Sequence, residues 1–387
     1  MRIGLDIRPL LKEATGVGTY WGNLLFSLAD IDRSNEYYLF STSLKDRFNR
    51  KHLPPFRRCE FKEFRYPQKW LNFFWSRWGG PRLDKFFHTD LDLTHSPVPL
   101  ICPTKGKKII TVHDLFFAEQ PQRADKEARR LFLPGLSRAL HQAEGIVAVS
   151  SYVKDMIMKK FSLSGQKIAV IHHGVDTGFF HPRKNRSDKS IREKYNLPEE
   201  YIFFIGTEEP RKNIPRLIEA CHLLFQHVPD TEMVIAGKPG RDTPAVQQKI
   251  KDFRISSRVK RLPYLPREEV PALYRGARLF VFPSLCEGFG LPLLEAAACR
   301  VPVAASRAPA LPEIGGDAAL YFDPRSPEDM ARVMRRGLED DAVREQLIQA
   351  GGKRIGRFSW NRAARLTQAF HFKTAGADPA ELSGKQS

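Results

Sequence analysis

Short apolar runs alternate with stretches of helical hydrophobic spacing along most of the chain. In the first half, helical patterns cover 19–29, 123–143 and the stretch from 151 onward, and the apolar runs are RIGLDI, YYLF, KKIITV and GIVAV. In the second half, helical or loop stretches separate the runs YIFFI, EMVIAG, ARLFVF, VPVAAS and ALYFD. Such alternation is typical of parallel strands joined by crossover helices. The pattern therefore predicts an α/β fold with two parallel-sheet domains.

A change of composition near the middle of the chain indicates where one domain ends and the next begins. The segment 181–190 reads HPRKNRSDKS, which is highly charged and nearly free of apolar anchors, so we place the interdomain linker there. The domains then span 1–180 and 190–357, and a length of 387 residues lets each bury its own core. Two such domains imply a cleft between them. The polar end, 374–387, is expected to be disordered.

Composition argues against several classes of protein. Hydrophobic residues make up 42% of the chain and charged residues 27%, and no stretch approaches the ~20 apolar residues of a membrane helix. The start, MRIGLDIRPLL, is interrupted by Asp6 and Arg8, which favours a first strand over a secretory signal. The five cysteines are scattered and odd in number, which argues against a disulfide framework and a zinc site. We therefore expect a cytoplasmic protein with reduced thiols.

The formal charge of +18 is large enough to attract polyanions, and the candidates are nucleic acid, anionic lipid headgroups and a phosphate-rich substrate. Charge alone does not choose among them. Basic and aromatic residues are interleaved in the segment 45–87, which includes Lys69, Trp70, Phe73, Phe74, Trp75, Arg77, Trp78 and Arg82. One hypothesis is peripheral contact with an anionic membrane. The alternative is a helix with a buried aromatic face and a solvated basic one.

The stretch after the run ARLFVF carries two glutamates. It reads PSLCEGFGLPLLEAAACR, in which Glu287 falls in a loop and Glu295 falls inside the next helix. Carboxylates are good acceptors for the vicinal hydroxyls of a ribose or a hexose. The alternative is a loop carboxylate and a solvated helix face that share the stretch by chance.

The start of that helix suits an anion. Pro292 favours a first helical turn and LLEAAA is strongly helix-forming, so the helix should begin near Gly290 and Leu291. Gly288 and Gly290 leave the backbone bare just before it, which lets N–H groups approach a ligand such as a pyrophosphate. A carboxylate pair beside a pyrophosphate site suits a nucleotide sugar.

Two cations follow the run YIFFI, in GTEEPRKNIPRLIEA. Arg211 and Lys212 stand next to each other where a helix should start, a position at which cations oppose the helix dipole unless an anion offsets them. This position favours contact with phosphate over solvated surface charge. In the first domain, His113 and Asp114 follow the strand KKIITV, and His113 could donate to a sugar hydroxyl or a phosphate. The alternative is a packed histidine held by a backbone carbonyl.

Two further motifs resemble known ligand-binding sequences. The stretch TGVGTYWG after the first strand contains Gly16 and Gly18, and it matches the dinucleotide fingerprint poorly because of its spacing. We interpret it as a mobile glycine loop that reaches over a bound phosphate or acceptor. The DLD at 90–92 resembles a metal-binding motif but precedes a strand instead of following one. We therefore predict no metal site.

These motifs together resemble the family four retaining glycosyltransferases of the GT-B fold, in particular the subgroup that uses GDP-mannose or related donors in bacterial surface polysaccharide synthesis. The resemblance spans residues 1 to about 373, and its most specific parts are PSLCEGFGLPLLEAAACRVPVAAS and GTEEPRKNIPRLIEA. It implies two Rossmann-like domains that face a cleft. It also implies that the stretch 358–373, which begins FSWNRAARLTQAF, is a closing helix that crosses back onto the first domain.

Residue by residue, the resemblance implies how the donor is held. Glu295 would hold the ribose hydroxyls, and Glu287 would contact the donor sugar together with the backbone of Gly288, Phe289 and Gly290.

The resemblance also implies contacts with the rest of the donor. Arg211 and Lys212 would neutralise the departing diphosphate, the backbone of Leu265 would touch the nucleobase, and His113 would contact the sugar. The glycines that match the family's loop near the phosphates and acceptor are Gly16 and Gly18.

The function expected from this resemblance is retaining transfer of a hexose, with mannose from GDP-mannose as the leading candidate. The acceptor would be a saccharide or lipid-linked saccharide in cell-surface polysaccharide synthesis. No cofactor or metal is expected, because the two cations and a helix amino end can stabilise the leaving diphosphate. No nucleic acid partner is expected. The alternatives are a non-catalytic nucleotide or polyanion binding protein and a GT-B epimerase or phosphorylase.

Overall fold

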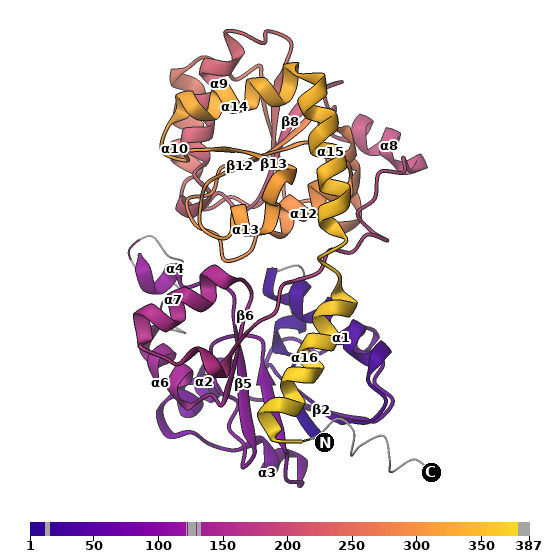
Figure 1. Ribbon diagram of the computed structural model, residues 1–387, viewed down its shortest axis with the longest axis vertical. Helices are drawn as coiled ribbons and strands as arrows, with labels where there is room; N and C mark the ends of the chain where they lie inside the picture. Colours follow the sequence, from indigo (N-terminus) through magenta and orange to yellow (C-terminus); the bar gives the residue numbers. More distant parts are fainter. Residues whose placement is uncertain (12–15, 121, 123–128, 130–132, 378–387) are drawn as a thin grey trace. The chain divides into compact units, whose positions relative to one another are not determined.

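The computed structural model describes residues 1–11, 16–120, 122, 129 and 133–377 (Figure 1). The chain divides into two compact units. The first comprises Met1–Gly174 and the chain from Trp360 onward, and the second comprises Val175–Ser359. Each unit contains one parallel sheet, which confirms the predicted α/β fold with two Rossmann-like parallel-sheet domains.

The first unit is built on a seven-stranded sheet with the order β3-β2-β1-β4-β5-β6-β7. The chain winds outward from β1 to β3 and then returns to β4 on the other side of β1, so the switch point lies between β1 and β4. The strands are β1 (Arg2–Asp6), β2 (Glu36–Thr42), β3 (Cys59–Phe64), β4 (Leu93–Ser96), β5 (Lys107–Val112), β6 (Gly145–Ala148) and β7 (Ile168–Val170). The described helices are α1 (Gly16–Ile31), α2 (Gln68–Trp78), α3 (Leu83–Phe87), α4 (Phe116–Glu119), α6 (Leu136–Gln142), α7 (Ser151–Phe161) and α16 (Trp360–Ala375).

The second unit is built on a six-stranded sheet with the order β10-β9-β8-β11-β12-β13 and its switch point between β8 and β11. The strands are β8 (Tyr201–Ile205), β9 (Glu232–Ala236), β10 (Val259–Leu262), β11 (Leu279–Phe282), β12 (Val303–Ser306) and β13 (Ala319–Phe322). The helices are α8 (Arg186–Lys194), α9 (Ile214–Phe225), α10 (Thr243–Asp252), α11 (Val270–Gly276), α12 (Leu291–Ala298), α13 (Leu311–Gly315), α14 (Pro327–Glu339) and α15 (Asp341–Ile355), and the 3-10 turns include η5 (Pro210–Lys212) and η6 (Arg267–Glu269).

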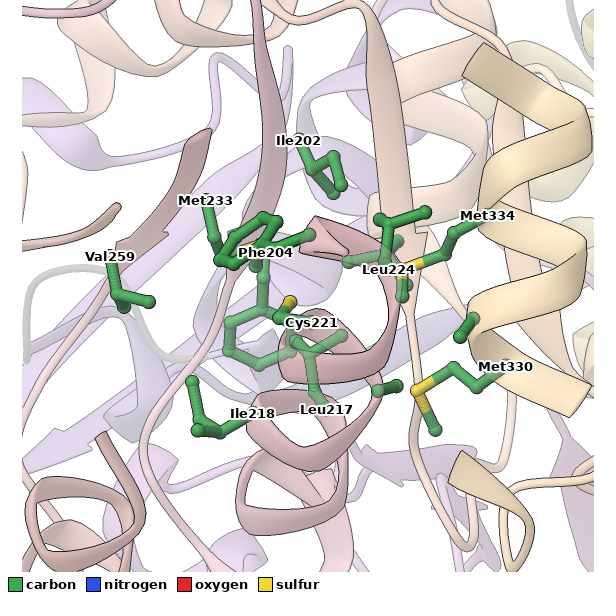
Figure 2. Close-up of a cluster of buried hydrophobic side chains, with 14 of the residues drawn as sticks. Ile202, Phe204, Leu217, Ile218, Cys221, Leu224, Met233, Val259, Met330 and Met334 are labelled. Atoms are coloured by element: carbon green, nitrogen blue, oxygen red, sulfur yellow. The ribbon is translucent and has the colours of Figure 1, made fainter. Parts of the chain in front are cut away.

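A hydrophobic core packs against the second sheet and supports the loops that follow its strands. The apolar residues of α9 recur three or four positions apart, so they form one face of the helix that packs on the sheet. Figure 2 shows this face together with side chains from the strands and from α14. The fully or nearly fully buried residues labelled there include Ile202, Phe204, Leu217, Ile218, Cys221, Leu224, Met233, Met330 and Met334. Burying each such side chain contributes roughly 1.5–3 kcal/mol to the stability of the fold. The loops that follow the strands are therefore attached to a stable sheet.

The closing helix predicted at 358–373 is α16, which belongs to the first unit and packs beside α1 (Figure 1). Its buried residues include Trp360, Ala364, Phe370 and His371. The stretch predicted to be disordered begins inside this helix, because α16 continues to Ala375; residues 378–387 lie outside the described part of the chain.

The predicted linker at 181–190 was wrong in part, because α8 begins at Arg186 and belongs to the second unit. Asn185 and Asp188 form a reciprocal capping box at its start. Asp188 also binds the guanidinium of Arg275, with an Nη2–Oδ1 distance of 2.5 Å, and Ile191 is buried. These few anchors order a segment whose composition resembles a linker.

The segment 45–87 includes β3, α2 and α3, and most aromatic rings of α2 are exposed. Leu71 and Trp75 of α2 are buried, but Trp70 and Trp78 are 68% and 65% exposed. The alternative of a helix with a buried aromatic face is therefore wrong for most of its rings. Among the described residues, no helix is long and apolar enough to cross a membrane.

Candidate active site

Asn213 joins three loops at the carboxyl edge of the second sheet. It takes a left-handed conformation, with φ 60°, between η5 and α9, and it is buried. Its Nδ2 donates to the carbonyl of Pro283 at 3.1 Å and to that of Pro324 at 2.7 Å. The N–H of Leu285 donates to the carbonyl of Arg211 at 2.7 Å. The loop after β11 is thereby held against η5.

This arrangement brings together Glu287, Arg211 and Lys212. Lys212 Nζ lies 2.7 Å from Glu287 Oε1, and Arg211 Nη1 lies 3.0 Å from Glu287 Oε2. Burial would raise the pKa of Glu287, but the charges of Lys212 and Arg211 outweigh it and lower the pKa to about 2. We call these three residues the ion triad. Two cations and one carboxylate leave a net positive charge.

The ion triad changes the interpretation of each member. Arg211 and Lys212 lie in η5, just before α9, as the sequence predicted for a helix start. The anion that offsets them in this structure is Glu287, so their position alone does not require a bound phosphate. Conversely, Glu287 was expected to contact the donor sugar, and here both of its oxygens accept from cations.

Helix α12 begins beside the ion triad, at Leu291, as the sequence predicted. Gly290 caps it with φ 115°, and a Cβ there would lie 2.7 Å from Leu311 Cδ2, so this position requires glycine. Phe289 is buried and packs its ring edge-on to Phe358, with ring centroids 5.9 Å apart. The first turn of α12 adds the positive end of a helix dipole next to a net positive cluster. An anion such as a diphosphate suits this place.

Glu295 lies in the second turn of α12 and differs sharply from Glu287. It is half-buried, and its Oε2 accepts from the hydroxyl of Tyr274 at 3.0 Å. Burial raises the pKa of Glu295 to about 7, although the Tyr274 hydrogen bond and the charge of Arg267 oppose the shift. A carboxylate with one hydroxyl partner has lone pairs left for a diol.

Leu265 follows β10 and is buried, so its side chain packs while its backbone lies in the loop before η6. The neighbouring Tyr264 is 41% exposed, and Lys238 Nζ lies 4.2 Å from the centre of its ring. The predicted nucleobase position is therefore on the same edge of the sheet as the ion triad, at the ends of β9 and β10.

His113 lies in the first unit, directly after β5. Its Nε2 is 2.9 Å from the carbonyl oxygen of Pro97, and because a carbonyl only accepts, Nε2 carries the proton. Burial lowers the pKa of His113 to about 4, although Pro97 and Asp114 oppose the shift, so the ring is neutral near pH 7. A neutral ring with Nε2–H presents a lone pair at Nδ1. A backbone carbonyl therefore holds His113, as the alternative interpretation had it, and Nδ1 can accept a hydrogen bond from a ligand. Nε2 already donates to Pro97, so it is not available as the expected donor to a sugar or phosphate.

Gly16 and Gly18 do not form a loop, which corrects the prediction of a mobile glycine loop. Both lie in the first turns of α1, and residues 12–15 lie outside the described part of the chain. The helix is driven by Tyr20, Trp21 and Leu24 and the apolar residues that follow at helical spacing, all buried. A glycine in a first helical turn costs less than one in the interior, so the aromatic pattern prevails.

Both halves of the chain match families of known glycosyltransferases. Residues 14–179 match the family model described as Glycosyltransferase Family 4, and residues 186–354 match the one described as Glycosyl transferases group 1. The chain is 32% identical over 266 residues to the O-antigen chain mannosyltransferase B of Escherichia coli, and the match covers 67% of this chain and 69% of that protein. The chain belongs to glycosyltransferase family 4.

Two further matches describe the extent of the likeness. The serotype-specific mannosyltransferase WbdA of Escherichia coli is 30% identical over 67% of this chain, but the match spans only 32% of WbdA. A crystal structure of HepE from Anabaena, in complex with UDP and glucose, matches with a TM-score of 0.71 and 17% identity over 97% of this chain and 100% of that one. The protein is a glycosyltransferase with the GT-B fold, so the alternative of a non-catalytic binding protein is set aside.

Glu208 is a further buried carboxylate at the carboxyl edge of the second sheet, and no sequence motif singled it out. Glu208 is buried just after β8, and Arg261 Nη2 binds its two oxygens at 2.6 and 2.8 Å. The hydroxyl of Thr243 donates to the same carboxylate. The available signal was a carboxylate three positions after the end of a buried strand, but its partner Arg261 is far away in the sequence and belongs to no motif.

The DLD stretch makes ordinary structural contacts. Asp90 pairs with Lys105 Nζ at 2.8 Å, and Asp92 accepts from the backbone N–H of Arg2 at 2.7 Å. Within the described ranges there is no group of three or more histidine, cysteine, aspartate or glutamate side chains that could hold a metal ion.

Proposed function

We propose that this glycosyltransferase transfers mannose from GDP-mannose to a saccharide or lipid-linked saccharide acceptor, with retention of the donor's anomeric configuration. The observation that carries the proposal is the pairing of a net positive ion triad with Glu295 along one loop and helix. The triad suits a diphosphate, and Glu295 suits a ribose diol. Mannose is favoured because the E. coli relatives are named as mannosyltransferases.

In the proposed reaction, Arg211 and Lys212 turn from Glu287 toward the leaving diphosphate, while Glu287 becomes able to accept from sugar hydroxyls. The bond between the sugar C1 and the phosphate oxygen breaks as the acceptor hydroxyl oxygen bonds C1 on the same face. The acceptor proton passes to the leaving phosphate oxygen. The two cations and the start of α12 stabilise the departing negative charge, so we propose that no metal or cofactor is required.

The remaining contacts are proposed from the family resemblance. The backbone of Leu265 would touch the base, and that of Gly288, Phe289, Gly290 and Leu291 would approach the donor. His113 would accept a hydrogen bond from a sugar hydroxyl at Nδ1. Gly16 and Gly18, at the start of α1, would lie near the phosphates or acceptor.

A thermal-shift panel of GDP, UDP, ADP and dTDP tests the choice of donor. A nucleotide at 100 times its dissociation constant should add roughly 2.7 kcal/mol of stability. We expect GDP to give the largest shift. Stabilisation by UDP alone would replace the proposed donor, and a covalent glycosyl-enzyme trapped with a slow donor would contradict attack on the same face without a protein nucleophile.

We also propose that the protein works at the cytoplasmic face of an anionic membrane, where α2 makes the contact. Three exposed aromatic rings on this helix contact one another. The ring centroid of Trp78 lies 5.5 Å from that of Phe73 and 5.2 Å from that of Phe74. The segment 45–87 carries twelve lysines and arginines against four acidic residues. Exposed tryptophans with a basic surround suit the headgroup region of anionic lipid. Five cysteines without a disulfide suit a reducing compartment.

Vesicle sedimentation tests the membrane contact. The wild type should sediment with phosphatidylcholine vesicles that contain about a third phosphatidylglycerol, and less with phosphatidylcholine alone. Trp70→Ser with Trp78→Ser should abolish the binding, while Leu366→Ser, an exposed apolar residue of α16, should not. Equal sedimentation of the double variant and the wild type would contradict the proposal. Binding of a soluble polysaccharide to α2 with no vesicle binding would assign this face to the acceptor instead.

A further inference from the structure

A continuous chain of buried polar side chains crosses the first unit from α16 to the end of β5. His371 Nε2 of α16 lies 3.0 Å from His95 Nδ1 on β4. His95 Nε2 lies 2.9 Å from Thr111 Oγ1 on β5. Thr111 Oγ1 lies 3.3 Å from the hydroxyl of Tyr20 on α1. Each of the four side chains is at most 1% exposed.

The tautomer of His371, at one end of this series of hydrogen bonds, determines which atoms carry the other protons. His371 Nδ1 is buried and makes no hydrogen bond within the part of the chain that the structure describes. A buried lone pair without a partner costs less than a buried N–H without one, so His371 carries its proton on Nε2. It therefore donates to His95 Nδ1, and His95 in turn donates from Nε2 to Thr111. Both histidines are neutral in this arrangement.

The series of hydrogen bonds ends at Tyr20, whose ring packs against His113. The ring of Tyr20 meets the ring of His113 edge to face, with centroids 4.7 Å apart and an interplanar angle of 80°. On the other side, Nε2–H of His113 donates a hydrogen bond to the carbonyl of Pro97. These two contacts, together with the ring of His173, whose centroid lies 5.4 Å from that of His113, orient Nδ1 of His113. A shift of Tyr20 would release one of them.

Packing alone does not explain four polar groups in this place. A phenylalanine and a leucine would fill the positions of Tyr20 and His371 without any polar group to desolvate, and such apolar replacements are often as stable. Hydrogen bonds between buried side chains instead restrict each side chain to one geometry among several. The geometry specified here is that of the ring against His113.

We infer that Tyr20 is a positioning residue for His113, and that His371, His95 and Thr111 hold Tyr20 in place. The inference rests on the proposed contact between His113 and the donor sugar. It makes α16 part of the machinery that orients His113, although its residues need not touch the substrate.

Five variants test this inference. Tyr20→Phe removes only the hydroxyl, and His371→Leu removes the donor to His95. His371→Gln keeps an N–H donor at a similar reach. Thr367→Val is the matched control, because Thr367 is also buried on α16 and its hydroxyl makes no hydrogen bond within the described chain. His113→Ala sets the size of the full loss.

We expect Tyr20→Phe and His371→Leu to lower kcat about tenfold to a hundredfold with little change in the donor KM, because the donor-binding residues are untouched. His371→Gln should restore most of the loss and Thr367→Val should behave as wild type. The nitrogen-15 resonances of His113 should report one tautomer in the wild type and a mixture in the two impaired variants, a change that a purely structural role would not cause.

Two outcomes would overturn the inference in different ways. If Tyr20→Phe and His371→Leu keep both the wild-type kcat and a single His113 tautomer while His113→Ala is inactive, the positioning role is wrong and the proposed function stands. If His113→Ala itself is fully active, the proposed contact of His113 with the sugar fails, and the positioning role fails with it.

Discussion

The buried polar groups around the ion triad in the second unit differ in kind from those that lead to His113 in the first unit. In the second unit, the loops after β8 and β11 bring three ionised side chains together, and the low pKa of Glu287 follows from its two cations. In the first unit, the side chains between α16 and His113 are neutral, and burial lowers the pKa of His371 to about 4 and that of His95 well below its usual value. A cation in an ion pair can exchange its carboxylate partner for an anionic ligand, whereas a series of hydrogen-bonded neutral side chains holds one geometry.

The largest expected effect comes from breaking the ion triad. Lys212→Met should lower kcat about a hundredfold to a thousandfold, because one cation for the leaving diphosphate is lost. It should also destabilise the protein by about 3 kcal/mol, because Glu287 keeps a buried charge with one partner fewer. Activity assays and urea unfolding measure the two effects.

The double variant Lys212→Met with Glu287→Gln separates these effects. It removes the uncompensated charge, so stability should recover while kcat stays low. Recovery of kcat as well would contradict the proposed role of the cation in the reaction.

The second prediction concerns acid stability of the first unit. The pKa values of His95 and His371 are depressed in the fold, so the unfolded chain binds more protons as the pH falls below about 6.5. The stability held above pH 6.5 should be lost as the pH falls toward 4, by about 3 kcal/mol for His371. Hydrogen exchange of β4 and β5 between pH 7 and about 4.5 measures this slope. His371→Gln should flatten it, and an unchanged slope would show that His371 is not a buried neutral group.

The third and smallest effect has the opposite sign and lies in the second unit. The pKa of Glu295 is raised to about 7, so the stability that it contributes is full below about 4.5 and is lost as the pH rises through 7. Glu295→Gln cannot ionise, and because solvent screens part of the charge of the half-buried Glu295, the variant should be about 2 kcal/mol more stable than wild type at pH 8. At pH 4 the two proteins should be nearly equal in stability. Thermal unfolding at both pH values provides the test. A Gln variant that is less stable at pH 8 would contradict the buried environment assigned to Glu295.

Local signals in the sequence predicted much of this structure. Pro292 and the run LLEAAA placed α12 correctly, and the buried central strands of both sheets were found from their apolar runs. The short or half-exposed strands β3, β7 and β10 were missed, because β3 at a sheet edge has no buried residue and β7 and β10 are only partly buried. The capped helix α8 was mistaken for a linker for a related reason: few of its residues are apolar.

The candidate site was predicted as a set of residues but not as a set of contacts. Glu287, Arg211 and Lys212 were each chosen, yet their mutual pairing depends on how two loops after different strands are held by Asn213. The hydrogen bonds that link His371 to Tyr20 were not predicted, because the first pair, His371 and His95, is separated by 276 positions in the sequence. Spacing rules describe neighbours on one helix or strand, and they do not reach such contacts.

The proposed function depends most on Glu295 of α12, which we expect to hold the nucleoside of the donor. Isothermal titration of GDP at pH 8 into wild type, Glu295→Ala and Glu345→Ala tests it most directly, since Glu345 is an exposed carboxylate on α15. Loss of hydrogen bonds to a charged group should raise the Kd of Glu295→Ala by at least about tenfold, and Glu345→Ala should match the wild type. An unchanged Kd in a folded Glu295→Ala protein would contradict the claim.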